Sequence, residues 1–151
     1  MAEINSVQAA LVAAGSKIKH CDHGKCEVIV MTTPATFSAL SIGDTIASGQ
    51  FIPKGSRILR VSKGNGTGTA SSTFDLGLRK RDGTVVDADG LVALNALTTA
   101  TTVDVEVGNG ALLAAGVDYV TTDDVEPYLT AQGAVLAANQ DIRLVIRYIG
   151  P

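Results

Sequence analysis

Aromatic side chains are scarce in this sequence: they make up 4% of the residues, and Trp is absent. Ligand pockets and binding hot spots usually draw on aromatic residues, so this composition lowers the expectation of a small-molecule site. Charged residues are also few, at 18%, against about 25% in an average soluble domain. A surface with so little charge is often partly covered by partners, and we therefore expect a protein that works by packing against others.

Long hydrophobic runs are also missing, and no leader is expected. No segment reaches the roughly 18 apolar residues that span a bilayer, so no membrane partner is expected. The first residues, MAEINSVQAALVAAGSK, lack the basic region of a signal peptide. We expect the protein to be made in a reducing cytosol, where Cys21 and Cys26 remain thiols. The net charge of -3 gives no argument for nucleic acid as a partner.

Residues 20–26, HCDHGKC, contain both histidines and both cysteines of the chain. A structural zinc site usually takes two ligand pairs from separate elements, and no second pair exists here. A Cys–His nucleophile would also need a separate orienting group. We favour a polar turn over a metal site at Cys21, His23 and Cys26. The hypothesis that the protein is a small hydrolase or metal enzyme is supported by this cluster alone. No catalytic, metal or cofactor-binding residue is therefore predicted.

The other motifs fit ordinary structural roles. The run Gly64–Gly68 misses the dinucleotide spacing by one residue and precedes a strand, so a hairpin loop is expected. Asp87 and Asp89 lack the remaining ligands of a calcium loop, and the pair at 123–124 has no frame, so both are interpreted as turn acids. The basic triplet 79–81 has no interleaved aromatic residues and is expected to be solvated or to form salt bridges between subunits.

Charge is distributed unevenly along the chain. Residues 1–81 hold ten Lys/Arg and five Asp/Glu, whereas residues 82–151 hold two and ten. In one interpretation, strands from both halves interleave and the charges mix within the fold. In the other, the subunit has a basic and an acidic side that suit side-by-side association.

Segments that alternate apolar and polar residues fill the chain from Cys26 onward. Turn signals such as Asp82-Gly83 separate them at intervals of about 8–12 residues. About eight to ten strands with this spacing predict an all-β fold, an antiparallel β-sandwich that is jelly-roll-like. We expect strands at 26–32, 36–42, 45–47, 57–61, 73–79, 85–86, 102–107, 127–130 and 141–149, the last two forming a hairpin.

Two regions have a different character. The stretch 6–14 is either a short helix, with Ser6 as N-cap and Gly15 after its end, or an extended arm that becomes ordered on a partner. Residues 88–101 are small and apolar, with a possible helical turn at 91–95. We therefore divide the chain into an N-terminal arm, residues 1–25, and a sandwich domain, residues 26–151.

The order of several motifs resembles the small head proteins of tailed bacteriophages, which include capsid decoration or cement proteins. The segments that carry the resemblance are Phe37–Ile46, Ile52–Ile58, Thr73–Leu78 and Ala137–Tyr148. The similarity extends over about residues 36–149. It implies a jelly-roll-like sandwich that belongs to the virion and lies on the capsid exterior.

This resemblance implies a non-enzymatic structural protein, made in the host cytoplasm, that cements neighbouring subunits of the major capsid protein. It also implies self-association as a homo-oligomer, with a trimer favoured, and no cofactor. Such a role calls for a rigid sandwich, free strand edges and an apolar contact surface. The alternative is a host- or carbohydrate-binding module on a phage head or tail, against which the scarcity of aromatic residues argues.

Overall fold

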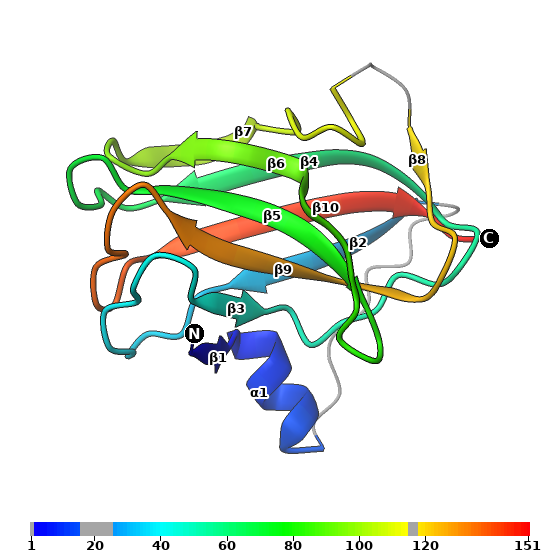
Figure 1. Cartoon of the computed structure of the whole chain (residues 1–151), viewed down its shortest axis with the longest axis horizontal. Coiled ribbons are helices and arrows are strands. Elements are labelled where there is room, and N and C mark those ends of the chain that lie inside the picture. Colours follow the sequence, from blue (N-terminus) through cyan, green and yellow to red (C-terminus); the bar gives the residue numbers. More distant parts are fainter. Residues whose placement is uncertain (1, 16–25, 115–117) are drawn as a thin grey trace.

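The computed structural model describes residues 2–15, 26–114 and 118–151. Within these ranges the chain forms ten strands and one short helix. The strands make two sheets that face each other, which confirms the predicted all-β sandwich (Figure 1). In the described ranges no helix is long and apolar enough to cross a membrane.

Sheet A, as we name it, has the strand order β1-β3-β9-β5-β6. Its neighbours are antiparallel except β1 and β3, which run parallel. The parallel pair is the exception in a sandwich otherwise built of antiparallel pairs. Its strands are β1 (Glu3–Asn5), β3 (Thr45–Ala47), β9 (Val125–Gln132), β5 (Thr73–Lys80) and β6 (Val85–Ala96).

Sheet B has the order β2-β10-β4-β7, and all of its pairs are antiparallel. The short strand β8 (Tyr119–Val120) pairs with one end of β4. The four main strands are β2 (Cys26–Thr32), β10 (Ile142–Ile149), β4 (Arg57–Asn65) and β7 (Thr101–Glu106). Both sheets therefore take strands from both halves of the sequence.

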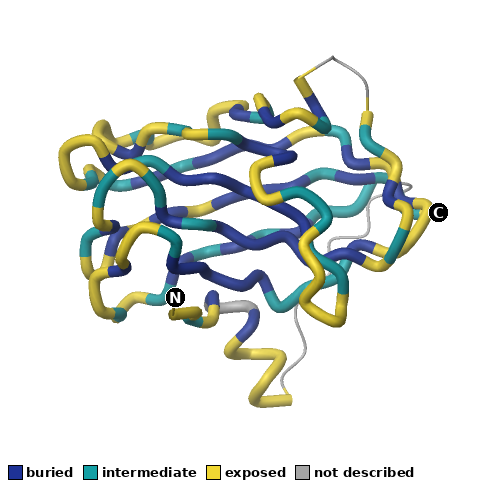
Figure 2. The backbone as a smooth tube through the Cα atoms, viewed as in Figure 1, coloured by how far each residue is buried: buried dark blue, intermediate teal, exposed yellow. Residues whose placement is uncertain are grey.

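The core lies between the two sheets. Phe74, Leu76 and Leu78 alternate along β5 and are fully buried, as their period-two spacing predicts. Leu129 of β9 and Ile146 of β10 meet them from neighbouring strands and the opposite sheet. Full burial of a side chain of this size stabilises the fold by about 1.5–3 kcal/mol. Figure 2 shows this buried layer running through the middle of both sheets.

Two predictions about local structure were wrong. Residues 36–42 are not a strand, because the only ladder contact there is an isolated bridge between Leu40 and Leu136. Leu40 is buried and Phe37 is half-buried. The predicted helical turn at 91–95 belongs to β6, which continues to Ala96. Leu91 and Val92 are fully buried there, so packing against the core overrides the weak local pattern.

The final hairpin was also predicted wrongly. The two strands β9 and β10 are consecutive but lie in different sheets, and the connection at 133–141 passes from one sheet to the other. Each strand pairs with partners that come earlier in the chain: β9 with β3 and β5, and β10 with β2 and β4. Alternation identifies a strand but does not name its partners, and hairpin closure is only the most local choice.

The stretch after β1 is a helix rather than an extended arm. Helix α1 (Val7–Ala13) begins at Ser6, whose side chain accepts a hydrogen bond from the backbone N–H of Ala9. Gly15 follows the helix with a φ of 71°. Residues 16–25 lie outside the described part, so the division into an arm of residues 1–25 and a sandwich of residues 26–151 stays a prediction.

Candidate interaction surfaces

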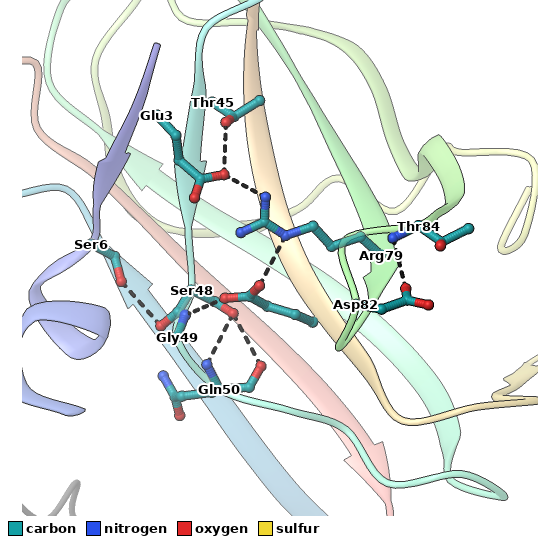
Figure 3. A network of polar contacts seen from close by, with 10 residues as sticks. Glu3, Ser6, Thr45, Ser48, Gly49, Gln50, Arg79, Asp82 and Thr84 are labelled. Carbon is teal, nitrogen blue, oxygen red and sulfur yellow. Dashed lines mark hydrogen bonds and ion pairs between the residues drawn. The ribbon is translucent and has the colours of Figure 1, made fainter. Parts of the chain in front are cut away.

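A polar network ties the N-terminal strand to the body of sheet A. Arg79 of β5 lies between two carboxylates, those of Glu3 on β1 and Glu126 on β9, with 2.9 Å from its Nε to Glu126 Oε2. Thr45 donates a hydrogen bond of 3.1 Å to the Glu3 carboxylate (Figure 3). The hydrogen bond from Arg79 lowers the pKa of Glu3 below its usual range. The three-residue strand β1 is thus held by charge as well as by its short ladder.

The predicted basic triplet is largely used within the molecule. Besides its two carboxylates, the Arg79 guanidinium lies 5.3 Å from the ring centroid of Tyr128. Lys80 forms an ion pair with Asp123 at 3.0 Å. The guanidinium of Arg81 lies 4.3 Å from the ring centroid of Phe51. All three side chains of the triplet therefore have a partner within the chain. Salt bridges between subunits are not needed to account for them.

Helix α1 is anchored at its start and open at its end. Ser6 is fully buried, with its N–H bonded to the carbonyl of Ala47 and its hydroxyl to the carbonyl of Ser48. Beyond this anchor, Leu11 is 40% and Val12 is 47% exposed. A seven-residue helix is marginal by itself in water, so its anchor and any partner must stabilise it. The exposed end is a candidate contact surface (Figure 2).

The outward face of sheet B carries a row of arginines on β4 and β10. On β10, the residues that share this face are Arg143, Val145, Arg147 and Ile149, as the alternation predicts. Arg143 lies 2.5 Å from Asp104 of β7. Among the described residues, Arg147 has no ion-pair partner.

Ion pairs connect the basic and acidic halves of the sequence. They join Arg57 to Asp118, Arg60 to Glu106, Arg79 to Glu126 and Lys80 to Asp123. Interleaving strands therefore neutralise part of the charge asymmetry within the fold. This arrangement favours the interpretation in which strands from both halves interleave and their charges mix within the fold.

The remaining motifs take structural positions. Strand β4 runs through Gly64 and Asn65, so the glycine-rich loop is shorter than predicted. Asp87 and Asp89 lie on strand β6, so their interpretation as turn acids was wrong. Asp124 accepts a hydrogen bond from the N–H of Lys54. No three ligand-type side chains come together within the described ranges. Cys21 and His23 lie outside those ranges, so the metal question at residues 20–26 is not tested.

Among the hollows lined by described residues are two that sequence reasoning did not find, because each joins residues that are distant in the chain. One, of about 380 Å³, is lined by opposite charges that include Lys80 and Asp123. The other is a groove of about 490 Å³ on the outward face of sheet A, between β1 and the β5–β6 hairpin. Its lining residues are Ala2, Glu3, Gly43, Thr45, Arg79, Gly83, Val85, Ala88, Tyr128, Thr130 and Gln132.

Comparison with known proteins gives matches to solved structures only. No family model matches the sequence, and no curated protein matches it. A chain in the capsid of Ralstonia phage GP4 superposes with a TM-score of 0.69, covering 99% of both chains at 16% identity. This protein shares its fold with a phage capsid chain. A chain in the capsid asymmetric unit of cyanophage Pam1 matches with a TM-score of 0.49, at 14% identity over 91% of this chain and 96% of that one.

Proposed function

We propose that this protein is a non-enzymatic structural component of a phage virion that binds the outside of the capsid and cements neighbouring major capsid subunits. The observation that carries the proposal is the shared fold with the Ralstonia phage GP4 capsid chain, which covers 99% of both chains. The motif resemblance to phage head proteins points to the same class.

The surfaces of the molecule suit this role. The exposed end of α1 offers Leu11 and Val12 to a neighbour, next to a helix start that is firmly anchored. Residues 1–25 would then act as the arm that reaches a capsid subunit. Binding through several weak contacts on a symmetric shell gains strength from multivalency, so no single contact has to be large. The protein would assemble as a homo-oligomer, with a trimer favoured.

Co-sedimentation with expanded empty heads of the source phage tests the proposal. We expect the wild-type protein to pellet with the heads to saturation and to raise the temperature at which they disassemble. Heads that bind none of the protein, or that bind it without any gain in stability, would contradict a cementing role.

Paired variants separate the contribution of the arm to head binding from that of the rest of the surface. Leu11→Asp places a charge on the exposed end of α1 and is expected to weaken head binding at least tenfold. Val120→Asp is the matched control, because Val120 is similarly exposed, at 48%, but lies on β8. Equal binding by the two variants would exclude the helix from the contact.

A further inference from the structure

The arginines of β4 and β10 on the outward face of sheet B are not all matched by acids. These two strands contain four arginines, and three of them form an ion pair with an acid of the same chain. The fourth, Arg147, forms neither an ion pair nor a side-chain hydrogen bond with any described residue. One positive charge on this face is therefore left over.

Arg147 lies directly opposite Arg60 in the ladder that joins β10 to β4. Side chains at such opposite positions share one face of the sheet, with Cβ atoms about 4.5–5.5 Å apart, and like charges there repel each other. Glu106 compensates only in part, because it is 3.6 Å from Arg60 and the two side chains are 64% and 63% exposed. A carboxylate placed between the two guanidinium groups would reduce this repulsion.

A buried hydroxyl on the same face also lacks a partner. Ser62 follows two residues after Arg60 on β4 and lies opposite Val145 on β10, so its side chain is on the outward face. It is 4% exposed, and its Oγ forms no hydrogen bond with the described part of the chain. Buried hydroxyls normally have a partner. An acceptor that reached this face would meet an unpaired hydroxyl as well as an unpaired cation.

The same chain carries acids that have no cation. Asp87 and Asp89 lie two residues apart on β6, and neither forms an ion pair within the described ranges. Asp89 is exposed. Burial raises the pKa of Asp87, and the nearby charge of Asp89 adds to this effect, so the two carboxylates repel each other. A cation from outside the chain would relieve that repulsion, just as an acid would on sheet B.

Opposite charges are thus left over on two different surfaces of one molecule. Arg147 lies on β10, an inner strand of sheet B, whereas Asp87 and Asp89 lie on β6, an edge strand of sheet A (Figure 1). A two-fold contact of sheet B with itself would bring the arginines of both copies together and is disfavoured by repulsion. A contact between the unlike surfaces pairs the leftover charges and can repeat around a ring. Charge complementarity therefore favours a second copy as the partner.

We propose that Arg147, with Arg60 beside it, binds the acidic pair of β6 from a second copy of this chain. The guanidinium groups would donate charge-assisted hydrogen bonds to the carboxylates of Asp87 and Asp89, and the Ser62 hydroxyl would donate a further one. That copies of the chain associate rests on the proposed function, which expects a homo-oligomer. The choice of the two surfaces rests on their charges and burial.

Sedimentation equilibrium of the purified full chain tests this contact without phage heads. We expect wild type to self-associate, and its dissociation constant to rise at least tenfold between about 50 mM and about 500 mM NaCl, because salt screens exposed charges. Arg147→Glu should raise the dissociation constant at least tenfold at the lower salt concentration. Arg81→Glu, the matched control, should leave it unchanged, because Arg81 already lies on the ring of Phe51. A monomeric wild type, or equal association of the two variants, would overturn the proposal.

Charge exchange identifies the partner surface. Asp87→Arg/Asp89→Arg should weaken self-association as much as Arg147→Glu does. A chain that carries all three substitutions should recover at least fivefold of the loss, because the charges are then exchanged rather than removed. Arg147→Gln removes the charge without reversing it and should weaken association at least fivefold, and it replaces Arg147→Glu if circular dichroism shows that variant to be unfolded. Unchanged association of Arg147→Gln, or no recovery in the folded triple variant, would also overturn the proposal.

Co-sedimentation with heads separates this inference from the proposed function. Wild type that self-associates through Arg147 but does not bind heads contradicts the proposed function and supports the contact between copies. Wild type that binds and stabilises heads but is monomeric in solution contradicts the contact between copies and supports the cementing role.

Discussion

Lys63 of β4 places an ammonium group at the inner side of the sandwich. The residue is 7% exposed, and its Nζ donates a hydrogen bond to the carbonyl of Ala96. The Nζ also lies 5.8 Å from the ring centroid of Phe74. No carboxylate pairs with it in the described ranges. Burial accordingly lowers the pKa of Lys63 below its ordinary value of 10.5.

Replacing Lys63 by Met should change how stability depends on pH. Between the lowered folded-state pKa and 10.5, the unfolded wild-type chain binds more protons than the folded protein. The contribution of Lys63 to the free energy of unfolding therefore rises with pH in this window. We expect the stability of wild type relative to Lys63→Met to increase from pH 7 to pH 10, measured by urea denaturation. A difference that stays constant with pH would contradict this account.

Gly77 of β5 is a second residue whose role is decided by its neighbours. A Cβ atom at this position would lie 2.4 Å from the carbonyl oxygen of Ala88, because irregular pairing brings the β6 backbone over β5. We expect Gly77→Ala to lower the free energy of unfolding by about 1–3 kcal/mol. Gly66→Ala is the control, since its Cβ would make only ordinary contacts of 3.8 Å and more. Calorimetry or denaturant unfolding distinguishes the two.

At the scale of elements, the sheet edges are occupied or irregular. Gln50 donates a side-chain hydrogen bond to the carbonyl of Val30 on β2. The loop at 108–113 bonds to the backbone of β6. Strand β1 has three residues, and β7 bulges away from β4, with three residues at 102–104 opposite Gly64. Such edges resist strand addition, so contacts with neighbours are better made by side-chain surfaces than by the free edges expected from the sequence.

The docking of α1 depends on the absence of a side chain at Gly49. This glycine has a φ of 70°, and a Cβ there would lie 2.3 Å from the Cα of Ala9. We expect Gly49→Ala to displace α1 and speed amide hydrogen exchange of residues 9–13 at least tenfold. Gly43→Ala tests backbone strain alone, because its φ is 90° but nothing lies within 4 Å. Unchanged exchange in Gly49→Ala would show that the helix does not need this contact.

At the scale of the whole molecule, two opposite faces differ in character. The outward face of sheet A holds the groove lined by Tyr128 and Thr130, whereas that of sheet B carries arginines of β4 and β10 that pair in part with acids of β7. A chain with unlike faces and an exposed helix end can contact different neighbours at the same time. This arrangement suits a subunit that contacts copies of itself as well as another protein.

Self-association follows from the proposed role and can be measured directly. We expect light scattering coupled to size-exclusion chromatography to give three times the chain mass of 15.5 kDa. Arg147→Glu should shift the protein toward lower mass if the sheet B face forms the contact, whereas Arg81→Glu should not, because Arg81 lies on the hairpin at the far end of β5. A monomeric wild type would contradict the homo-oligomer.

Much of the local structure could be predicted from the sequence by itself. The strand 26–32 and the alternation of Phe74, Leu76 and Leu78 each follow from side chains a few residues apart, and Ser6 was identified as the cap if the stretch after it is a helix. Local spacing and capping chemistry act over the same short range in the folded chain, so such patterns survive folding. The all-β class follows from the same signals repeated along the chain.

The tertiary structure alone decided how these elements meet. The separation of β9 and β10 into different sheets and the groove between β1 and the β5–β6 hairpin both depend on contacts between residues distant in the sequence. The physical reason is that strand pairing and burial are settled by competition among many possible partners across the whole chain. A local pattern shows that a strand has an apolar face, but only the packed fold determines what that face meets.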